Sequence, residues 1–188
     1  NINLLVNDNF NAIKKLILAY FLLLLFEGAL RKWFLPSLSN GLLIIRDPIV
    51  IWIYYLAINQ NIFPSTNKYI RFLIRLTIIS VFLSVAVQGH PLTIGYGIRT
   101  NLLHFPLIFI MGKVLTHEDV IMYGKLFLLL ALPMTWVVAE QFQSDRLDAI
   151  NVAAGGTGHQ MMTSGDKVRA SGTFTFISGI VFYYCFTI

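Results

Sequence analysis

Long apolar stretches alternate with short polar segments along most of this chain. A helix needs roughly 20 predominantly apolar residues to cross about 30 Å of hydrocarbon, so such runs predict transmembrane helices where charge, Pro, Gly or Asn bounds them. Six runs meet or approach this length, at about residues 16–35, 42–58, 72–87, 101–115, 120–142 and 174–188. Pro133 interrupts the fifth run and predicts a kink. The pattern predicts an all-α, polytopic integral membrane protein with about six transmembrane helices.

A polar, glycine-rich segment separates the fifth and sixth runs. It covers about residues 143–173 and leads into the sequence RASGTF (169–174). In a membrane protein, a polar loop set on rigid helices is a common place for binding and catalytic residues. We therefore expect the chemistry of this protein in or near this segment.

The composition agrees with a membrane protein, because 56% of the residues are hydrophobic and only 12% are charged. The last run stops at Ile188 after about two thirds of a crossing. The chain begins with Asn1, and its first residues lack the cleavage pattern of a signal peptide. We therefore expect residues 1–188 to be a fragment of a single membrane domain.

The basic residues do not orient the chain, because its 14 lysines and arginines divide evenly between the two sides of the predicted spans. Lys68, Arg71 and Arg75 cluster at one helix start and slightly favour a cytoplasmic N-terminus. The side with the glycine-rich segment carries as many cations as the other side. If that face is external, its cations indicate an anionic ligand.

Several charges lie near or inside the spans, where a lone ionised side chain costs several kcal/mol and must be paired or reach water. Glu27 and Arg31 are four residues apart, which predicts that they pair with each other. Arg46 and Asp47 precede a proline that interrupts helical hydrogen bonding, and both a structural and a ligand-binding role stay open for them. Arg99 lies at the mouth of the fourth run, from which it can snorkel outward or reach a ligand.

Metal, redox and nucleotide chemistry lack sequence support. No His, Cys or carboxylate residues have the spacing that zinc sites need, and Cys185 is the only thiol. His90 and His104 each lie near a proline, where a hydrogen-bonded structural role is expected. The glycine run at 155–159 lacks the ending of a phosphate-binding loop. We expect no metal, no cofactor and no nucleic acid partner.

Four motifs, taken in order, resemble the N-terminal half of O-antigen ligase or polymerase family membrane proteins. They are FEGALRKW (26–33), IRDP (45–48), the stretch from Gln141 through Ile150-Asn151 to Gly155-Gly156, and RASGTF (169–174). The similarity spans nearly the whole chain and is closest to the branch found in exopolysaccharide gene neighbourhoods. Some members of the wider group carry an inorganic-carbon transporter label.

The resemblance implies a multi-pass, all-helical enzyme at the outer face of a bacterial inner (plasma) membrane, with residues 143–173 as an extracytoplasmic loop. Such enzymes move a glycan from an undecaprenyl-diphosphate carrier to a sugar hydroxyl. The implied partners are a lipid-linked oligosaccharide donor, a saccharide or lipid-saccharide acceptor, and membrane lipid. The family's arginine in an Arg-x-x-Gly pattern maps onto Arg169, with Gly172 as its glycine, and engages the donor diphosphate. Its proposed general-base histidine lies further along than Ile188, so His159 takes no such role and ligase and polymerase stay indistinguishable.

The residue chemistry fits this reading, because planar guanidinium groups bind diphosphate oxygens bidentately and can stabilise a leaving diphosphate without a metal. We assign Arg169 as catalytic and Arg99, Arg46 and Gly172 as substrate-binding. The sequence thus predicts a metal-independent glycosyltransferase-type ligase or polymerase.

The alternative is a transporter of a small anion such as bicarbonate, with helices broken near Pro48, Pro91 and Pro106. Most candidate charges lie at span ends, which favours the interfacial enzyme. A purely structural subunit is a third hypothesis.

Overall fold

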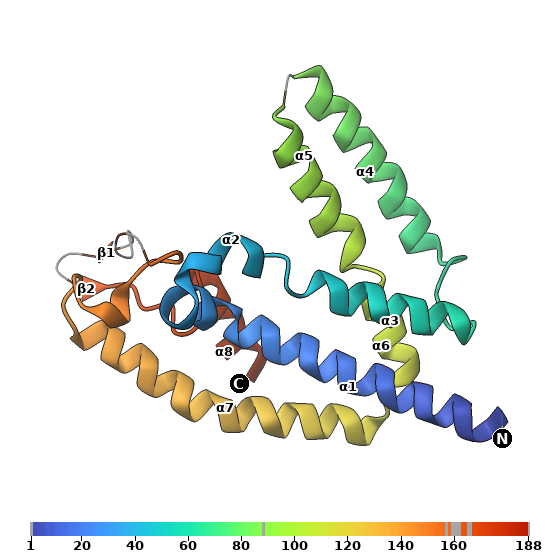
Figure 1. Cartoon of the computed structure of the whole chain (residues 1–188), viewed down its shortest axis with the longest axis horizontal. Coiled ribbons are helices and arrows are strands. Elements are labelled where there is room, and N and C mark those ends of the chain that lie inside the picture. Colours follow the sequence, from blue (N-terminus) through green and yellow to red (C-terminus); the bar gives the residue numbers. More distant parts are fainter. Residues whose placement is uncertain (1, 88, 157, 159–162, 165–166, 188) are drawn as a thin grey trace. The chain divides into compact units, whose positions relative to one another are not determined.

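The computed structural model is predominantly helical and describes residues 2–87, 89–156, 158, 163–164 and 167–187 (Figure 1). The α-helices are α1 (Ile2–Ala29), α2 (Ser39–Leu42), α3 (Asp47–Asn59), α4 (Lys68–Ala86), α5 (Pro91–Ile98), α6 (Leu107–Val114), α7 (His117–Gln143) and α8 (Ile177–Thr187). Single turns of π-helix form η1 (Leu30–Phe34) and η3 (Arg99–Leu103), and 3₁₀ turns form η2 (Pro36–Leu38) and η4 (Ala149–Asn151). Strands β1 (Thr163–Ser164) and β2 (Lys167–Val168) pair in antiparallel register, with Thr163 opposite Val168.

The chain divides into two compact units. The first unit comprises Asn1–Ile17 and Asp47–Leu115, and the second comprises Leu18–Arg46 and Thr116–Ile188. Each unit has its own buried residues and its own polar cluster.

In the first unit, α3 packs against α6. The buried residues of α3 are Val50, Ile53 and Ala57, and those of α6 are Leu107, Ile110 and Val114. Both sets repeat after three and then four residues, which places each set on one face of its helix. Helices α4 and α5 form an antiparallel pair beyond them (Figure 1).

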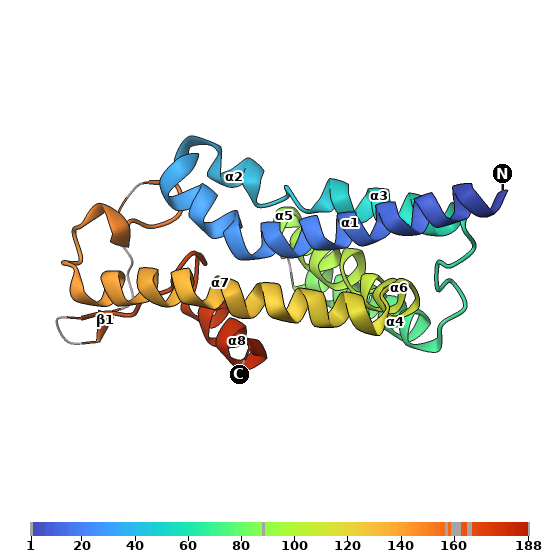
Figure 2. The same ribbon diagram turned by 90° about the horizontal axis from the view of Figure 1, so that it is seen from below.

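In the second unit, α8 lies alongside α7 (Figure 2). Their shared core contains Leu25, Phe127, Met134, Ile180 and Tyr183. The Tyr183 hydroxyl lies inside this core and donates a 2.6 Å hydrogen bond to the Phe127 carbonyl, which satisfies both groups. The core therefore fixes α8 against the middle of α7.

Local sequence signals explain where several helices begin. Thr116 and Asp119 form a reciprocal capping box at the start of α7. The His90 imidazole accepts a hydrogen bond from the Leu92 amide and caps α5, which confirms the structural role expected of His90.

Three helical stretches of the described residues are long and apolar enough to cross a membrane, judged by length and composition. They are Pro36–Asn59, Lys68–Ala86 and His117–Gln143. Many large apolar side chains on these stretches face outward, as lipid-facing positions do, including Phe82 and Leu132. The two complete helices among them match the predicted runs 72–87 and 120–142, and α7 continues through Pro133.

By length and composition, the described residues support three of the predicted spans and not the number of about six. The run at 101–115 is divided, because Pro106 cannot continue the π-turn η3, and α6 after it has only 8 residues. Helix α8 has 11 residues, and the run over 174–188 was itself predicted to cover only about two thirds of a crossing. The run predicted at 16–35 falls in α1, which begins earlier, at Ile2, and ends at Ala29. The run predicted at 42–58 is interrupted by a turn before α3.

The polar segment 143–173 is a largely non-helical connection in its described residues, as the sequence predicts. Helix α7 ends at Gln143, and the connection contains η4 and the short β1–β2 hairpin before α8. Strand β2 lies next to α7. The connection therefore returns along the helix that it follows.

Candidate functional site

The side chain of Gln141 holds the turn at Ser171 and Gly172 in the RASGTF motif. Its Oε1 accepts hydrogen bonds from the Ser171 amide at 3.1 Å and the Gly172 amide at 2.8 Å. Its Nε2 donates to the carbonyls of Gly172 and Ile150, both at 3.2 Å. All four hydrogen-bonding positions of this fully buried amide are therefore used.

Lys32 reaches the same turn. This lysine is only 2% exposed, and its Nζ donates to Ser171 Oγ at 2.6 Å and to the Gly172 carbonyl at 3.3 Å. Lys32 therefore places a buried amine against the turn.

Two glycines make this arrangement sterically possible. Gly172 has φ = +59°, and a Cβ there would lie 2.9 Å from Met134 Sδ. Gly28 lets α1 approach the backbone of the three residues after Gly172, Thr173 to Thr175. There the Thr173 hydroxyl also donates a 2.7 Å hydrogen bond to the Leu25 carbonyl. The structure thus gives Gly172 a backbone role, and its predicted substrate contact stays a prediction.

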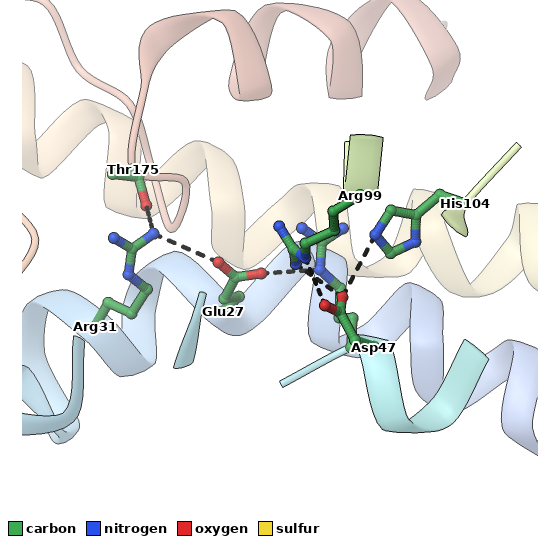
Figure 3. A network of polar contacts seen from close by, with 7 residues as sticks. Glu27, Arg31, Asp47, Arg99, His104 and Thr175 are labelled. Atoms are coloured by element: carbon green, nitrogen blue, oxygen red, sulfur yellow. Dashed lines mark hydrogen bonds and ion pairs between the residues drawn. The ribbon is translucent and has the colours of Figure 1, made fainter. Parts of the chain in front are cut away.

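Glu27 forms an ion pair with Arg31 (Figure 3) and a second ion pair with Arg46. Arg31 Nη1 lies 3.4 Å from Glu27 Oε1, which confirms the pair predicted from their spacing, and it also donates to Thr175 Oγ1 at 3.4 Å. Arg46 Nε donates to Glu27 Oε2 at 2.9 Å. One carboxylate therefore holds two guanidinium groups, and this cluster carries a surplus positive charge.

Residues from all four motifs meet in the second unit, which includes Ile45 and Arg46 of IRDP, whereas Asp47 and Pro48 belong to the first unit. FEGALRKW is joined to IRDP by the Glu27–Arg46 pair and to RASGTF by the Lys32 hydrogen bonds. It also accepts a 3.0 Å hydrogen bond at the Arg31 carbonyl from the Gly155 amide. The third motif contacts RASGTF again through Gln141. Segments up to 148 residues apart in the chain thus share one polar cluster.

A groove of about 670 Å³ lies beside this cluster, between the last turns of α7 and strand β2. Val138, Ala139 and Phe142 form its apolar wall, and Lys167 and Arg169 provide cations. The Lys167 ammonium lies 5.6 Å from the centre of the Phe142 ring. The groove thus combines apolar surface and positive charge where an apolar helix gives way to a polar loop.

The first unit contains a separate ionic cluster around Asp47 (Figure 3). Arg99 holds the carboxylate bidentately, through Nε to Oδ2 and through Nη2 to Oδ1 at 2.8 Å. His104 Nε2 lies 3.5 Å from Asp47 Oδ1. The cluster ties the start of α3 to the π-turn η3 and the residue after it.

The predicted site residues are therefore distributed over both units. Arg169, Gly172 and Arg46 lie in the second unit, in the groove, the Gln141-held turn and the Glu27 cluster. Arg99 belongs to the first unit and pairs with Asp47. His159 lies outside the described residues. The residues described here contain no group of three or more His, Cys, Asp or Glu side chains that could hold a metal ion.

Three residues of the site were not predicted from the sequence, namely Lys32, Gln141 and Ser171. Lys32 lies inside the predicted span 16–35, and Gln141 lies inside the predicted span 120–142. Ionisable and polar side chains within apolar spans tend to face the protein interior and to have partners. That rule was the available signal for Lys32 and Gln141, whereas Ser171 carried none of its own.

Comparisons of this chain with protein families, curated proteins and solved structures find no match.

Proposed function

We propose that this chain is part of a multi-pass enzyme of a bacterial inner membrane that transfers a glycan from an undecaprenyl-diphosphate carrier to a saccharide acceptor. In this proposal, the chain crosses the membrane at the other predicted spans as well as at the three long apolar helices. Residues 143–173 lie on the extracytoplasmic side. The enzyme acts in O-antigen or exopolysaccharide assembly.

The groove at Arg169 is the observation that carries the proposal. A polyprenyl diphosphate has a long apolar chain and a highly charged headgroup. The wall formed by Val138, Ala139 and Phe142 offers apolar contact, and Lys167 and Arg169 offer cations beside it. Because the groove follows the end of an apolar helix, it suits a ligand whose headgroup lies at the membrane surface.

The chemistry of transfer fits a site built from cations. The bond between the anomeric carbon and the diphosphate oxygen breaks, the acceptor hydroxyl oxygen takes its place, and undecaprenyl diphosphate leaves with the bonding electrons. The resemblance assigns the acceptor's proton to a base beyond Ile188. In this step negative charge grows on the diphosphate, which a bidentate guanidinium stabilises. The surplus cation around Glu27 adds to the positive potential of the same unit.

The test is complementation of a deletion strain with the complete protein carrying Arg169→Ala. Removing one well-placed donor to a developing anion typically lowers the rate about 100-fold or more. We expect surface polysaccharide to disappear and undecaprenyl-linked saccharide to accumulate, with membrane levels of the protein unchanged on a blot.

Arg146→Ala is the matched control, because Arg146 is an exposed cation of the same polar segment and does not line this groove. This variant should leave surface polysaccharide and undecaprenyl-linked saccharide at their wild-type levels. Normal polysaccharide in correctly inserted Arg169→Ala protein would remove the central residue of the proposal.

A transporter of a small anion such as bicarbonate is the second candidate, and the Asp47 cluster favours it. The stretch Pro36–Asn59 is broken just before α3, and Asp47 is its twelfth residue of 24, so the charge lies near the middle of the stretch rather than at its end. Broken helices that hold ionisable residues near the midplane are typical of secondary transporters. The pairing partner Arg99 also lies at a helix interruption, in η3.

Bicarbonate uptake into proteoliposomes that contain the complete protein separates the two candidates. Uptake that Asp47→Asn abolishes and Arg169→Ala leaves intact would support the transporter. No uptake above empty liposomes, together with the polysaccharide defect of Arg169→Ala, would support the transferase.

A further inference from the structure

Lys32 is a buried cation joined directly to the turn that follows Arg169. Its ammonium donates to Ser171 Oγ at 2.6 Å and to the Gly172 carbonyl at 3.3 Å, and it lies 5.7 Å from the centre of the Trp33 ring. Only one residue, Ala170, separates Arg169 from Ser171. A change at Lys32 is therefore transmitted to Arg169 through two residues of backbone.

Burying an amine at this position has a cost that packing alone does not require. A methionine has a similar length and would fill the space without losing the hydration of a charge. Gln141 already satisfies the Ser171 and Gly172 amides, so the backbone of the turn has a partner without the lysine. What Lys32 adds to the contacts of Gln141 is its bond to the Ser171 hydroxyl, which restrains the Ser171 side chain.

We propose that Lys32 is a positioning residue for the transferase site: its ammonium holds Ser171 and Gly172 so that Arg169 stays in the groove. This inference rests on the proposed function, because Lys32 affects transfer only if Arg169 binds the donor. Lys32 itself lies under the turn and does not line the groove. It therefore acts on ligand binding through the placement of Arg169.

The first experiment measures binding of undecaprenyl diphosphate to the complete protein in lipid nanodiscs. Loss of a hydrogen bond from a charged group typically weakens an equilibrium about tenfold to a hundredfold. We expect Lys32→Met to raise the Kd about tenfold or more, and Ser171→Ala to act in the same direction from the other end of the 2.6 Å bond. Lys125→Met is the control, because Lys125 is exposed on α7, and it should leave the Kd unchanged.

A double-mutant cycle separates positioning from general destabilisation. Arg169→Lys keeps a charge but loses bidentate contact, so it should bind weakly yet measurably. If Lys32 acts through Arg169, adding Lys32→Met to Arg169→Lys should weaken binding much less than it does in the wild-type background. Equal effects in both backgrounds would overturn the positioning role.

Maleimide labelling of an introduced cysteine tests the placement of the turn without any ligand. Cys185→Ser removes the exposed cysteine, and Ala170→Cys supplies a reporter next to Arg169. Lys32→Met and Ser171→Ala should each raise the labelling rate several-fold, whereas Lys125→Met should not. An unchanged rate in the first two variants would refute the claim that Lys32 holds the turn.

The outcomes distinguish the two proposals. If the wild type binds undecaprenyl diphosphate and Lys32→Met binds it equally well, the positioning role fails and the transferase stands. If the wild type does not bind the carrier, the transferase fails and Lys32 loses its role in it, while the labelling rates still decide whether Lys32 holds the turn.

Discussion

Gly28→Ala should destabilise the second unit, although alanine is the better helix former. Gly28 lies in α1, where replacing glycine by alanine would by propensity alone stabilise a helix by about 1 kcal/mol. A Cβ at this position would overlap the Thr173 carbonyl oxygen and would lie 2.7 Å from the Thr175 amide nitrogen. These contacts involve backbone, which cannot rotate away as a flexible side chain can.

The size of the effect follows from what must move. Cβ contacts below 3.0 Å are essentially never seen, so α1 and the Thr173–Thr175 backbone must separate. Their separation strains the Thr173 hydrogen bond to Leu25 and the two bonds from Lys32. Overpacking of this kind costs about 1–3 kcal/mol or more. Loss of one or two buried hydrogen bonds adds about 1–3 kcal/mol. After subtracting the gain in helix propensity, we expect Gly28→Ala to lower the free energy of unfolding by about 3 kcal/mol.

Thermal unfolding in detergent, followed by size-exclusion chromatography after heating, measures this loss. For a chain of this size about 3 kcal/mol lowers Tm by roughly 6–12 °C. Gly124→Ala is the matched control, because Gly124 lies inside α7 and a Cβ there meets nothing within 4 Å. It should leave Tm unchanged or raise it slightly. A Gly28→Ala protein as stable as Gly124→Ala would refute the close approach of α1 to the turn.

The remaining predictions concern the polar contacts. Gln141→Leu leaves the Ser171 and Gly172 amides without their shared acceptor and should lower stability by about 3 kcal/mol or more, measured by the same heating assay. Asp47→Asn removes the charge that Arg99 pairs with and should lower the free energy of unfolding by about 2 kcal/mol or more. Replacing Asp47 by Leu and Arg99 by Met together should lower it less. A double variant that is less stable than Asp47→Asn would contradict this prediction.

The apolar periodicity of the sequence located the long helices well, because a hydrophobic run of sufficient length has few alternatives to a helix. The predicted runs 72–87 and 120–142 differ from α4 and α7 by only a few residues at each end. The prediction was wrong where hydrophobicity continues across a break in helical geometry. In the run 101–115, the residues remain apolar while Pro106 ends the hydrogen-bonding pattern, so that α6 is short.

The candidate site was predicted in its parts and not in its assembly. The Glu27–Arg31 pair follows from helical spacing, which is local information. The contacts of Lys32 and Gln141 with the turn join residues 30 to 140 positions apart, and no spacing rule connects them. The pairing of Asp47 with Arg99, 52 positions away, could not be predicted for the same reason.

The distance in sequence between Lys32 and Ser171 also imposes an order of events during synthesis. The two residues are 139 positions apart, and at about 5–20 residues per second the ribosome needs roughly 7–28 s to reach the second after the first. Through that interval the amine of Lys32 has been made and its hydroxyl acceptor has not. Until Ser171 has been made, water or another group must take its place beside the Lys32 amine. The hydrogen bonds that join these two segments of the second unit can therefore form only after residue 171 has been synthesised.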